Sequence, residues 1–165
     1  MSNSGKHLRR LDRIFTRSPV YFITTTVAGR RGILNSSAMQ DVVEEVWSNG
    51  ESLYGWSVGP YVIMPDHVHF FCRETSEAAS SLSSFVGKWK EWTSKYGSKR
   101  LEIALPLWQA GFFDHVLRSG ESLREKIEYV WHNPVRGGLV DEPEDWPFKG
   151  NPGNWGVYDG EANSE

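Results

Sequence analysis

The sequence predicts an α+β domain whose antiparallel sheet follows the split β-α-β, ferredoxin-like order, with one helix added at the C-terminal end. Three observations predict this class. Segments rich in β-branched and aromatic residues alternate with segments whose apolar residues recur at helical spacing. The first six segments follow the order β-α-β-β-α-β of that pattern. A chain of 165 residues, 39% hydrophobic and 13% aromatic, suits one domain with one core.

The first two elements are a strand and a helix. Residues 19–27, PVYFITTTV, are mostly β-branched or aromatic and predict a strand, and the GRRG that follows predicts a loop. Residues 35–50 start with capping residues and then carry apolar side chains at helical spacing, at Val42, Val43, Val46 and Trp47. This pattern predicts a helix that ends near Gly50.

Two strands and a second helix follow. Residues 53–64 predict a strand with a bulge or bend at Gly59-Pro60, and residues 67–73 predict the next strand after a turn at Pro65-Asp66. Residues 78–96 predict a helix because apolar side chains recur at helical spacing, at Leu82, Phe85, Val86 and Trp89.

The last two elements are a strand and the added helix. Residues 97–110 predict mainly loop, whereas residues 111–118, GFFDHVLR, predict the fourth strand. Residues 119–133 predict a helix with a Ser-x-x-Glu start signal at Ser122 and Glu125, which Pro134 is expected to stop.

We expect a single domain over residues 1–148, which includes a basic N-terminal arm at 1–18, and an acidic, loosely ordered tail over 149–165. The first 31 residues hold seven basic side chains and one acid, whereas residues 141–165 hold seven acids and one base. The chain without residues 141–165 is therefore mildly basic, although the net charge of the whole chain is −3. Because polyanion binding depends on local patches of charge, the overall charge does not exclude a nucleic-acid partner.

A cytoplasmic protein without a membrane span is the expectation from composition. No apolar run reaches the roughly 20 residues that cross a bilayer, and the N-terminus lacks the apolar segment of a signal peptide. The single cysteine, Cys72, excludes an internal disulfide and an all-cysteine metal site.

Two histidines interrupt the hydrophobic stretch YVIMPDHVHFF. Side chains in a strand alternate between faces, so His67 and His69 are expected to point the same way. Two imidazoles on one face could bind one metal ion or grip one phosphate. Two histidines leave a divalent ion short of ligands, so Asn133 and a substrate phosphate could complete a mixed nitrogen and oxygen site that suits Mg²⁺ or Mn²⁺.

The last predicted helix carries a polar stripe. Tyr129 and Asn133 are four residues apart, with Glu125 one turn earlier, so the three share one side of the helix. A tyrosine hydroxyl can act as a nucleophile when a metal polarises its target. The alternative from the residues alone is a packing aromatic with its hydroxyl at the surface.

Four segments in this order resemble one family. They are YFITTTVAGRRGIL, YVIMPDHVHFF, LWQAGFFDHVLRSGESL and YVWHNPVRGGLV, which together span most of residues 19–148. Each is moderately specific alone, but their combination resembles the single-tyrosine HUH transposases of bacterial insertion sequences, closest to the REP-associated tyrosine transposase branch. One departure is Asp66, where the family usually has asparagine. Its extra carboxylate could tune the metal site or cap the turn, and the cap is the expected role.

The resemblance implies roles for individual residues. His67 and His69 match the metal-binding pair, Tyr129 matches the nucleophile and Asn133 matches the position that helps complete the metal site. It implies cleavage and rejoining of single-stranded DNA, with hairpin-forming repeats as targets, through a 5′-phosphotyrosine link. Mg²⁺ or Mn²⁺ is then the expected cofactor, and no nucleotide cofactor is needed because the covalent link keeps the bond energy.

Basic residues are the candidates for phosphate contacts, which orient DNA without reading its sequence. The set comprises Arg9, Arg10, Arg13, Arg30, Arg31, Arg118 and Arg136. Trp108 and Gln109 belong to a family motif, and a buried tryptophan that holds the loop is expected there rather than one that stacks on bases.

Three alternatives stand beside the transposase. A domesticated member would bind or nick hairpin DNA without transposing, and a non-catalytic member would only bind it. A nucleotidyl hydrolase or transferase of the histidine-triad type would need a third alternating histidine, but the position is Phe71. The sequence leaves open whether the protein is a monomer or a homodimer.

Overall fold

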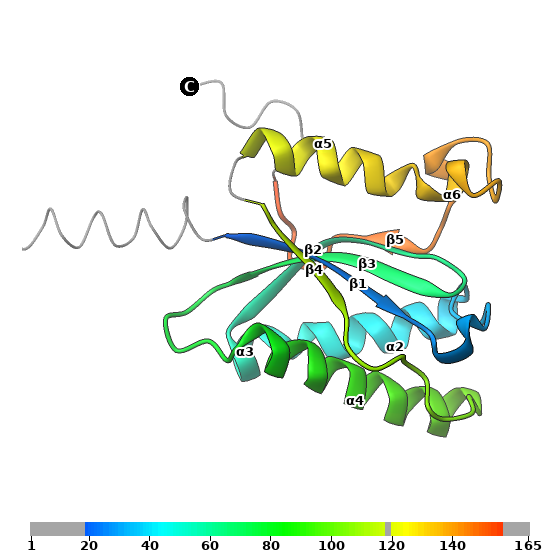
Figure 1. The fold of residues 1–165 in the computed structure, drawn as a ribbon, viewed down its shortest axis with the longest axis horizontal. Coiled ribbons are helices and arrows are strands. Elements are labelled where there is room, and N and C mark those ends of the chain that lie inside the picture. The colour runs from blue at the N-terminus through cyan, green and yellow to red at the C-terminus, as the bar shows by residue number, and fades with distance from the viewer. Residues whose placement is uncertain (1–18, 118–119, 157–165) are drawn as a thin grey trace, which may run out of the picture.

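The structure is a computed structural model that describes residues 19–117 and 120–156, built around one five-stranded sheet (Figure 1). The strands are β1 Val20–Thr26, β2 Trp56–Ile63, β3 His67–Glu74, β4 Phe113–Leu117 and β5 Lys149–Gly150. They lie in the order β4-β1-β3-β2-β5, and every neighbouring pair is antiparallel. The predicted fold class is therefore confirmed, with β5 as an additional edge strand.

Helices cover both faces of this sheet (Figure 1). One face carries α2 Ser37–Ser48, α3 Gly50–Tyr54 and α4 Leu82–Leu101, and the other carries α5 Gly120–Trp131 and α6 Asn133–Arg136. Two short 3-10 turns, η1 Ala28–Arg30 and η2 Pro143–Asp145, complete the described elements. The helix added to the ferredoxin-like pattern thus lies alone, with its short continuation, across the sheet from the other helices.

Capping explains where the two long helices begin. The Ser36 side chain accepts a hydrogen bond from the backbone N–H of Met39 at 3.1 Å, and Ser81 does the same for Ser84 at 3.1 Å. Helix α4 therefore starts at Leu82 and not at the predicted residue 78. It also continues to Leu101, five residues past the prediction, where Glu102 turns left-handed at φ 56°.

Two further boundaries differ from the prediction. Leu53 and Tyr54 belong to α3 and not to the second strand, which begins at Trp56 after Gly55 turns the chain at φ 75°. Helix α5 ends at Trp131, two residues before the predicted end, and Pro134 lies in the first turn of the short helix α6, where proline is tolerated. The bulge predicted at Gly59-Pro60 is confirmed by a register shift between Val58 and Tyr61.

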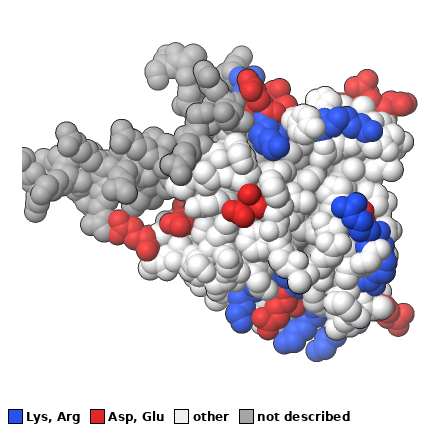
Figure 2. All heavy atoms as spheres, viewed as in Figure 1, with Lys and Arg blue, Asp and Glu red and all other residues white. Residues whose placement is uncertain are grey.

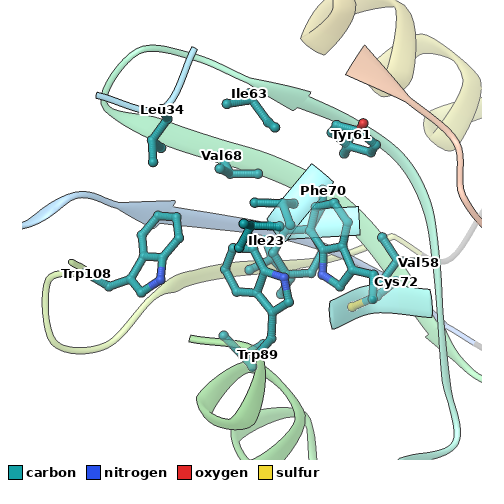
Figure 3. Packing of buried hydrophobic residues seen from close by; sticks show 14 of the residues in the cluster. Ile23, Leu34, Val58, Tyr61, Ile63, Val68, Phe70, Cys72, Trp89 and Trp108 are labelled. Carbon is teal, nitrogen blue, oxygen red and sulfur yellow. The ribbon is translucent and has the colours of Figure 1, made fainter. Parts of the chain in front are cut away.

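Stacked tryptophans fill the core on the α2–α4 side of the sheet (Figure 3). Trp89 packs against Trp47 at 5.2 Å and Trp108 at 5.0 Å between ring centroids. The Trp108 indole N–H donates to the Thr93 hydroxyl at 2.9 Å, which confirms the prediction of a buried tryptophan that holds its loop. Cys72 is fully buried in the same core.

Replacing Trp89 with alanine is expected to lower the free energy of unfolding by about 3–5 kcal/mol, because a large cavity opens between packed rings. Trp92 lies three residues away on the same helix but is 37% exposed. Trp92→Ala is the matched control and should cost about 1 kcal/mol or less. Urea unfolding of both variants measures the difference; equal losses would show that the stacked rings do not hold this core.

The first part of the predicted tail, as far as residue 156, is packed against the sheet, which differs from the expectation of a loosely ordered tail over 149–165. Lys149–Gly150 pairs with β2, and Trp155 is 2% exposed with its indole N–H donating to the Ser57 hydroxyl at 2.9 Å. A Cβ added at Gly59 would lie 2.3 Å from the Trp155 ring, so the absence of a side chain at the bulge makes room for it. The rest of the predicted tail and the arm at 1–18 lie outside the described residues.

No described helix combines the length and apolar character needed to cross a bilayer.

Candidate active site

The two histidines of β3 lie side by side on the face of the sheet that α5 covers. In the antiparallel register His69 stands opposite Thr24 and His67 opposite Thr26. The two Nε2 atoms are 3.1 Å apart, and the ring centroids are 4.6 Å apart. The prediction that both imidazoles share one face is confirmed, and the structure adds that they converge on one point.

A second polar group holds each ring from behind. His67 Nδ1 lies 2.7 Å from Asp66 Oδ1, and His69 Nδ1 lies 2.8 Å from Thr24 Oγ1. With the Nδ1 protons directed to these oxygens, both Nε2 lone pairs face the shared point. The Asp66 carboxylate thus contacts the ring of the adjacent His67, the arrangement expected if it tunes the histidine pair.

This donor set fits a divalent cation in adjacent coordination positions. Two ligands at right angles, each about 2.1 Å from an octahedral ion, lie about 3.0 Å apart, close to the observed 3.1 Å. The same 3.1 Å separation is also within hydrogen-bond distance, so without a cation one Nε2 can donate to the other in the tautomer that carries its proton there. Among the described residues no group of three or more histidine, cysteine or acidic side chains could hold a metal, so further ligands would have to be amide, water or phosphate oxygens.

Burial keeps His69 neutral. The pKa of His69 is lowered to about 3, first because burial disfavours the charged imidazolium and then because His67, Lys126 and Arg136 add positive charge nearby. A neutral imidazole leaves its Nε2 lone pair free at physiological pH. The influence of Lys126 and Arg136 also shows that basic groups of α5 and α6 lie close to the histidines.

Acid is expected to destabilise the protein through His69. The unfolded histidine takes up a proton near pH 6.5, whereas the folded one does so only near pH 3. The contribution of His69 to the free energy of unfolding is therefore fully present above pH 6.5. It falls by about 1.4 kcal/mol per pH unit as the pH drops from 6.5 towards 3. Urea unfolding of wild type and His69→Gln at several pH values should show that stability depends less steeply on pH in the variant, by about one proton; equal slopes would contradict this role of His69.

Tyr129 lies on the exposed side of α5, between two cations. Its side chain is 57% exposed, the Arg136 guanidinium carbon lies 3.7 Å from the ring centre and Lys126 Nζ lies 5.3 Å from it. Leu123, Ile127 and Val130 face the sheet and are buried, so the predicted division of this helix into a polar and an apolar side is confirmed.

A chain of contacts connects the tyrosine with the histidines. Lys126 Nζ lies over the Phe22 ring at 4.6 Å, and Phe22 stacks on His69 with 5.2 Å between ring centroids. Lys126 also contacts the Tyr129 ring, and Arg136 contacts this ring as well. One continuous group of five side chains therefore crosses the α5–sheet boundary: Arg136, Tyr129, Lys126, Phe22 and His69. Sequence reasoning missed Lys126, although its position three residues before Tyr129 places it on the same side of the helix.

Asn133 is the first residue of α6, and its side chain is oriented by Arg136. The Asn133 amide oxygen accepts a hydrogen bond from the Arg136 guanidinium, which also donates to the backbone carbonyl of Tyr129 at 2.5 Å. The predicted third metal ligand therefore lies beside the tyrosine and has one lone pair engaged. A carbonyl oxygen has a second lone pair for another partner.

The predicted phosphate-binding arginines have different surroundings. Arg30 is exposed at the end of η1, on the side of the molecule where Figure 2 shows basic side chains along the turn after β1. Arg31 donates to the carbonyls of Ala28 at 3.0 Å, Ala104 at 3.0 Å and Pro106 at 2.6 Å, so it ties two loops together. That structural role has no signal in the sequence. Four predicted arginines lie outside the described residues: Arg9, Arg10, Arg13 and Arg118.

Comparison with known proteins gives three findings. The family described as transposase IS200 like matches residues 17–132, more than half of the chain. A REP-associated tyrosine transposase of Escherichia coli (strain K12) is 25% identical over 140 residues, covering 82% of this chain and 78% of the relative. A solved REP-associated tyrosine transposase bound to a REP hairpin has the same fold, with a TM-score of 0.69 and 22% identity over 81% of this chain and 76% of that one.

Proposed function

The chain belongs to the family of IS200-like transposases, and from this premise we propose that it cuts and rejoins single-stranded DNA through a covalent link to Tyr129. One observation carries the proposal beyond the family. Two imidazole nitrogens converge 3.1 Å apart on the sheet, and a chain of side-chain contacts joins them to an exposed tyrosine flanked by two cations. That arrangement suits an anionic substrate bound at the edge of α5, beside the histidine pair of the sheet.

His67 and His69 would hold a divalent cation through their Nε2 atoms, with Asn133 as a third protein ligand. The shortfall of nitrogen ligands and the near-octahedral spacing favour Mg²⁺ or Mn²⁺ over a structural zinc. Bound there, such a cation would polarise the scissile phosphate as a Lewis acid. Asp66 and Thr24 would fix the ring orientations from behind, a contribution that commonly strengthens metal binding.

Tyr129 would act as the nucleophile. Its hydroxyl oxygen forms a bond to the phosphorus, the bond from phosphorus to the 3′-oxygen breaks, the phenolic proton leaves to solvent and the 3′-oxygen takes up a proton. The products are a 5′-phosphotyrosine and a free 3′-hydroxyl. Attack by a 3′-hydroxyl on this link is the reverse step and joins strands without a nucleotide cofactor. Lys126 and Arg136 would favour the negative charge that accumulates on the phosphate.

Hairpin-forming repeat DNA is the proposed substrate. The support is the relative that is named a REP-associated tyrosine transposase and the structural match that carries a REP hairpin. Arg30 and Arg136 would contact phosphates of the strand, and the other proposed contacts are Arg9, Arg10, Arg13, Arg31 and Arg118. A domesticated protein that nicks hairpins without transposing would use the same chemistry.

The test is formation of a covalent adduct. Wild-type protein is incubated with labelled single-stranded DNA that carries the palindromic repeats flanking its gene, with Mg²⁺, Mn²⁺ or EDTA. A shifted protein–DNA band that requires the metal, with a nucleotide found on Tyr129 by mass spectrometry, is the expected result. Cleavage without any adduct would contradict the tyrosine mechanism, and tight binding without cleavage across all metals would favour a non-catalytic hairpin binder.

A further inference from the structure

Two consecutive phenylalanines at the start of β4 have opposite surroundings. Phe112 packs against the core on the α2–α4 side of the sheet. Phe113 is 60% exposed. An exposed phenylalanine ring contributes little to stability, so the stability of the fold does not explain why this ring is there. Phe113 lies in the segment LWQAGFFDHVLRSGESL, but the resemblance assigns it no role.

Phe113 stands in one cross-strand row with the histidine site. Phe113 pairs with Thr24 of β1, and Thr24 pairs with His69 of β3. Directly paired residues of an antiparallel sheet point to the same face. Phe113 therefore faces the same side as His69, and Thr24, which bonds His69 Nδ1, lies between them.

The distance in this row suits a nucleotide. Neighbouring strands are about 4.8 Å apart, so Phe113 and His69, two strands apart, are separated by about 10 Å along the sheet. A phosphate near the His69 Nε2 atom would thus have an exposed aromatic ring within reach of an adjacent base. Strand β4 is also the edge of the described sheet, so no further strand of the described chain covers this side of the ring.

We propose that Phe113 is a stacking platform for a base next to the scissile phosphate, and that it positions the strand in the active site. This inference rests on the proposed function. Every base has an aromatic face, so such a platform tolerates different sequences and fixes the register of the strand rather than reading it. Phe113 is then a positioning residue, whereas the charged groups around Tyr129 bind the backbone.

The experiment combines a protein change with a DNA change. All proteins carry Tyr129→Phe, so that the DNA stays intact in the presence of Mg²⁺, and affinity is measured by fluorescence anisotropy. Phe113→Ala is compared with Phe113→Trp and with Leu53→Ala, which removes a 67% exposed side chain from α3 on the opposite layer. The cleavage site is first mapped with the wild-type protein. The DNA is then either the intact hairpin or one of a set of hairpins, each with a single abasic site at a different position beside the cleavage site.

The expected result is a loss of about 10-fold in affinity for Phe113→Ala, within the range for one stacked base, and near wild-type affinity for Phe113→Trp and Leu53→Ala. At one abasic position the Phe113→Ala loss should disappear, because the stacking partner is already missing. Unchanged affinity in Phe113→Ala, or a loss that persists at every abasic position, would overturn the inference while wild-type cleavage still supports the proposed function. If wild type neither cleaves nor binds hairpin DNA, the proposed function fails first and this inference fails with it.

Discussion

Tyr129→Phe is expected to lower the rate of covalent adduct formation by about a thousand-fold or more, on the scale seen when an enzyme loses its nucleophile. The change removes one oxygen atom from an exposed side chain and leaves the ring that contacts Lys126 and Arg136. Affinity for the hairpin should therefore stay within about 10-fold, the loss of one hydrogen bond at most. Adduct is measured on denaturing gels and affinity by anisotropy.

Tyr96→Phe on α4 is the matched control, because Tyr96 also lies beside an arginine, Arg100, but on the opposite layer of the fold. It should form adduct at the wild-type rate. Metal-dependent cleavage that continues in Tyr129→Phe would show that water, and not this tyrosine, attacks the phosphate. Loss of binding together with loss of adduct would instead assign Tyr129 a role in substrate recognition.

His67→Ala is expected to weaken binding of Mn²⁺ by more than about a hundredfold, because even the groups behind a metal ligand contribute about 10- to 100-fold and His67 would be a ligand itself. Adduct formation should fall in parallel at fixed Mn²⁺. The His67 side chain is 27% exposed, so its removal disturbs packing less than removal of a fully buried side chain would. Calorimetric titration with Mn²⁺ measures the affinity directly, and it does not depend on cleavage.

His132→Ala provides the comparison, since His132 is an exposed histidine near the end of α5 whose Nδ1 lies 2.7 Å from the Glu128 carbonyl oxygen. That variant should bind Mn²⁺ as wild type does. If His67→Ala also binds Mn²⁺ normally, the pair is not the metal site, and the histidines would then be direct contacts to the phosphate.

The sequence alone was sufficient to predict the features that depend on the periodicity of side chains in a strand or helix, and on the order of these elements along the chain. Alternation in β3 placed both histidines on one face, and the helical period separated Tyr129 from Ile127, because both patterns are set by backbone geometry alone. The strand order followed from the sequence of elements.

Features that depend on distant partners could not be read from the sequence. Thr24 supports His69 only because β1 pairs with β3, and Arg31 meets the carbonyls of a loop more than 70 residues away. The packing of Trp155 was missed because composition after Pro143 is rich in proline, glycine and acids, a pattern typical of loosely ordered chain.

The separation of the active site between two layers has a further consequence. The histidines belong to the sheet, Tyr129 belongs to α5, and the apolar contacts of Ile127 and its neighbours with the sheet set the height of the helix above the strands. In the proposed mechanism this layer is a spacer, because its thickness sets how far the Tyr129 hydroxyl lies from the bound phosphate. A substitution of Ile127 that keeps the protein folded would then change the cleavage rate without contacting DNA.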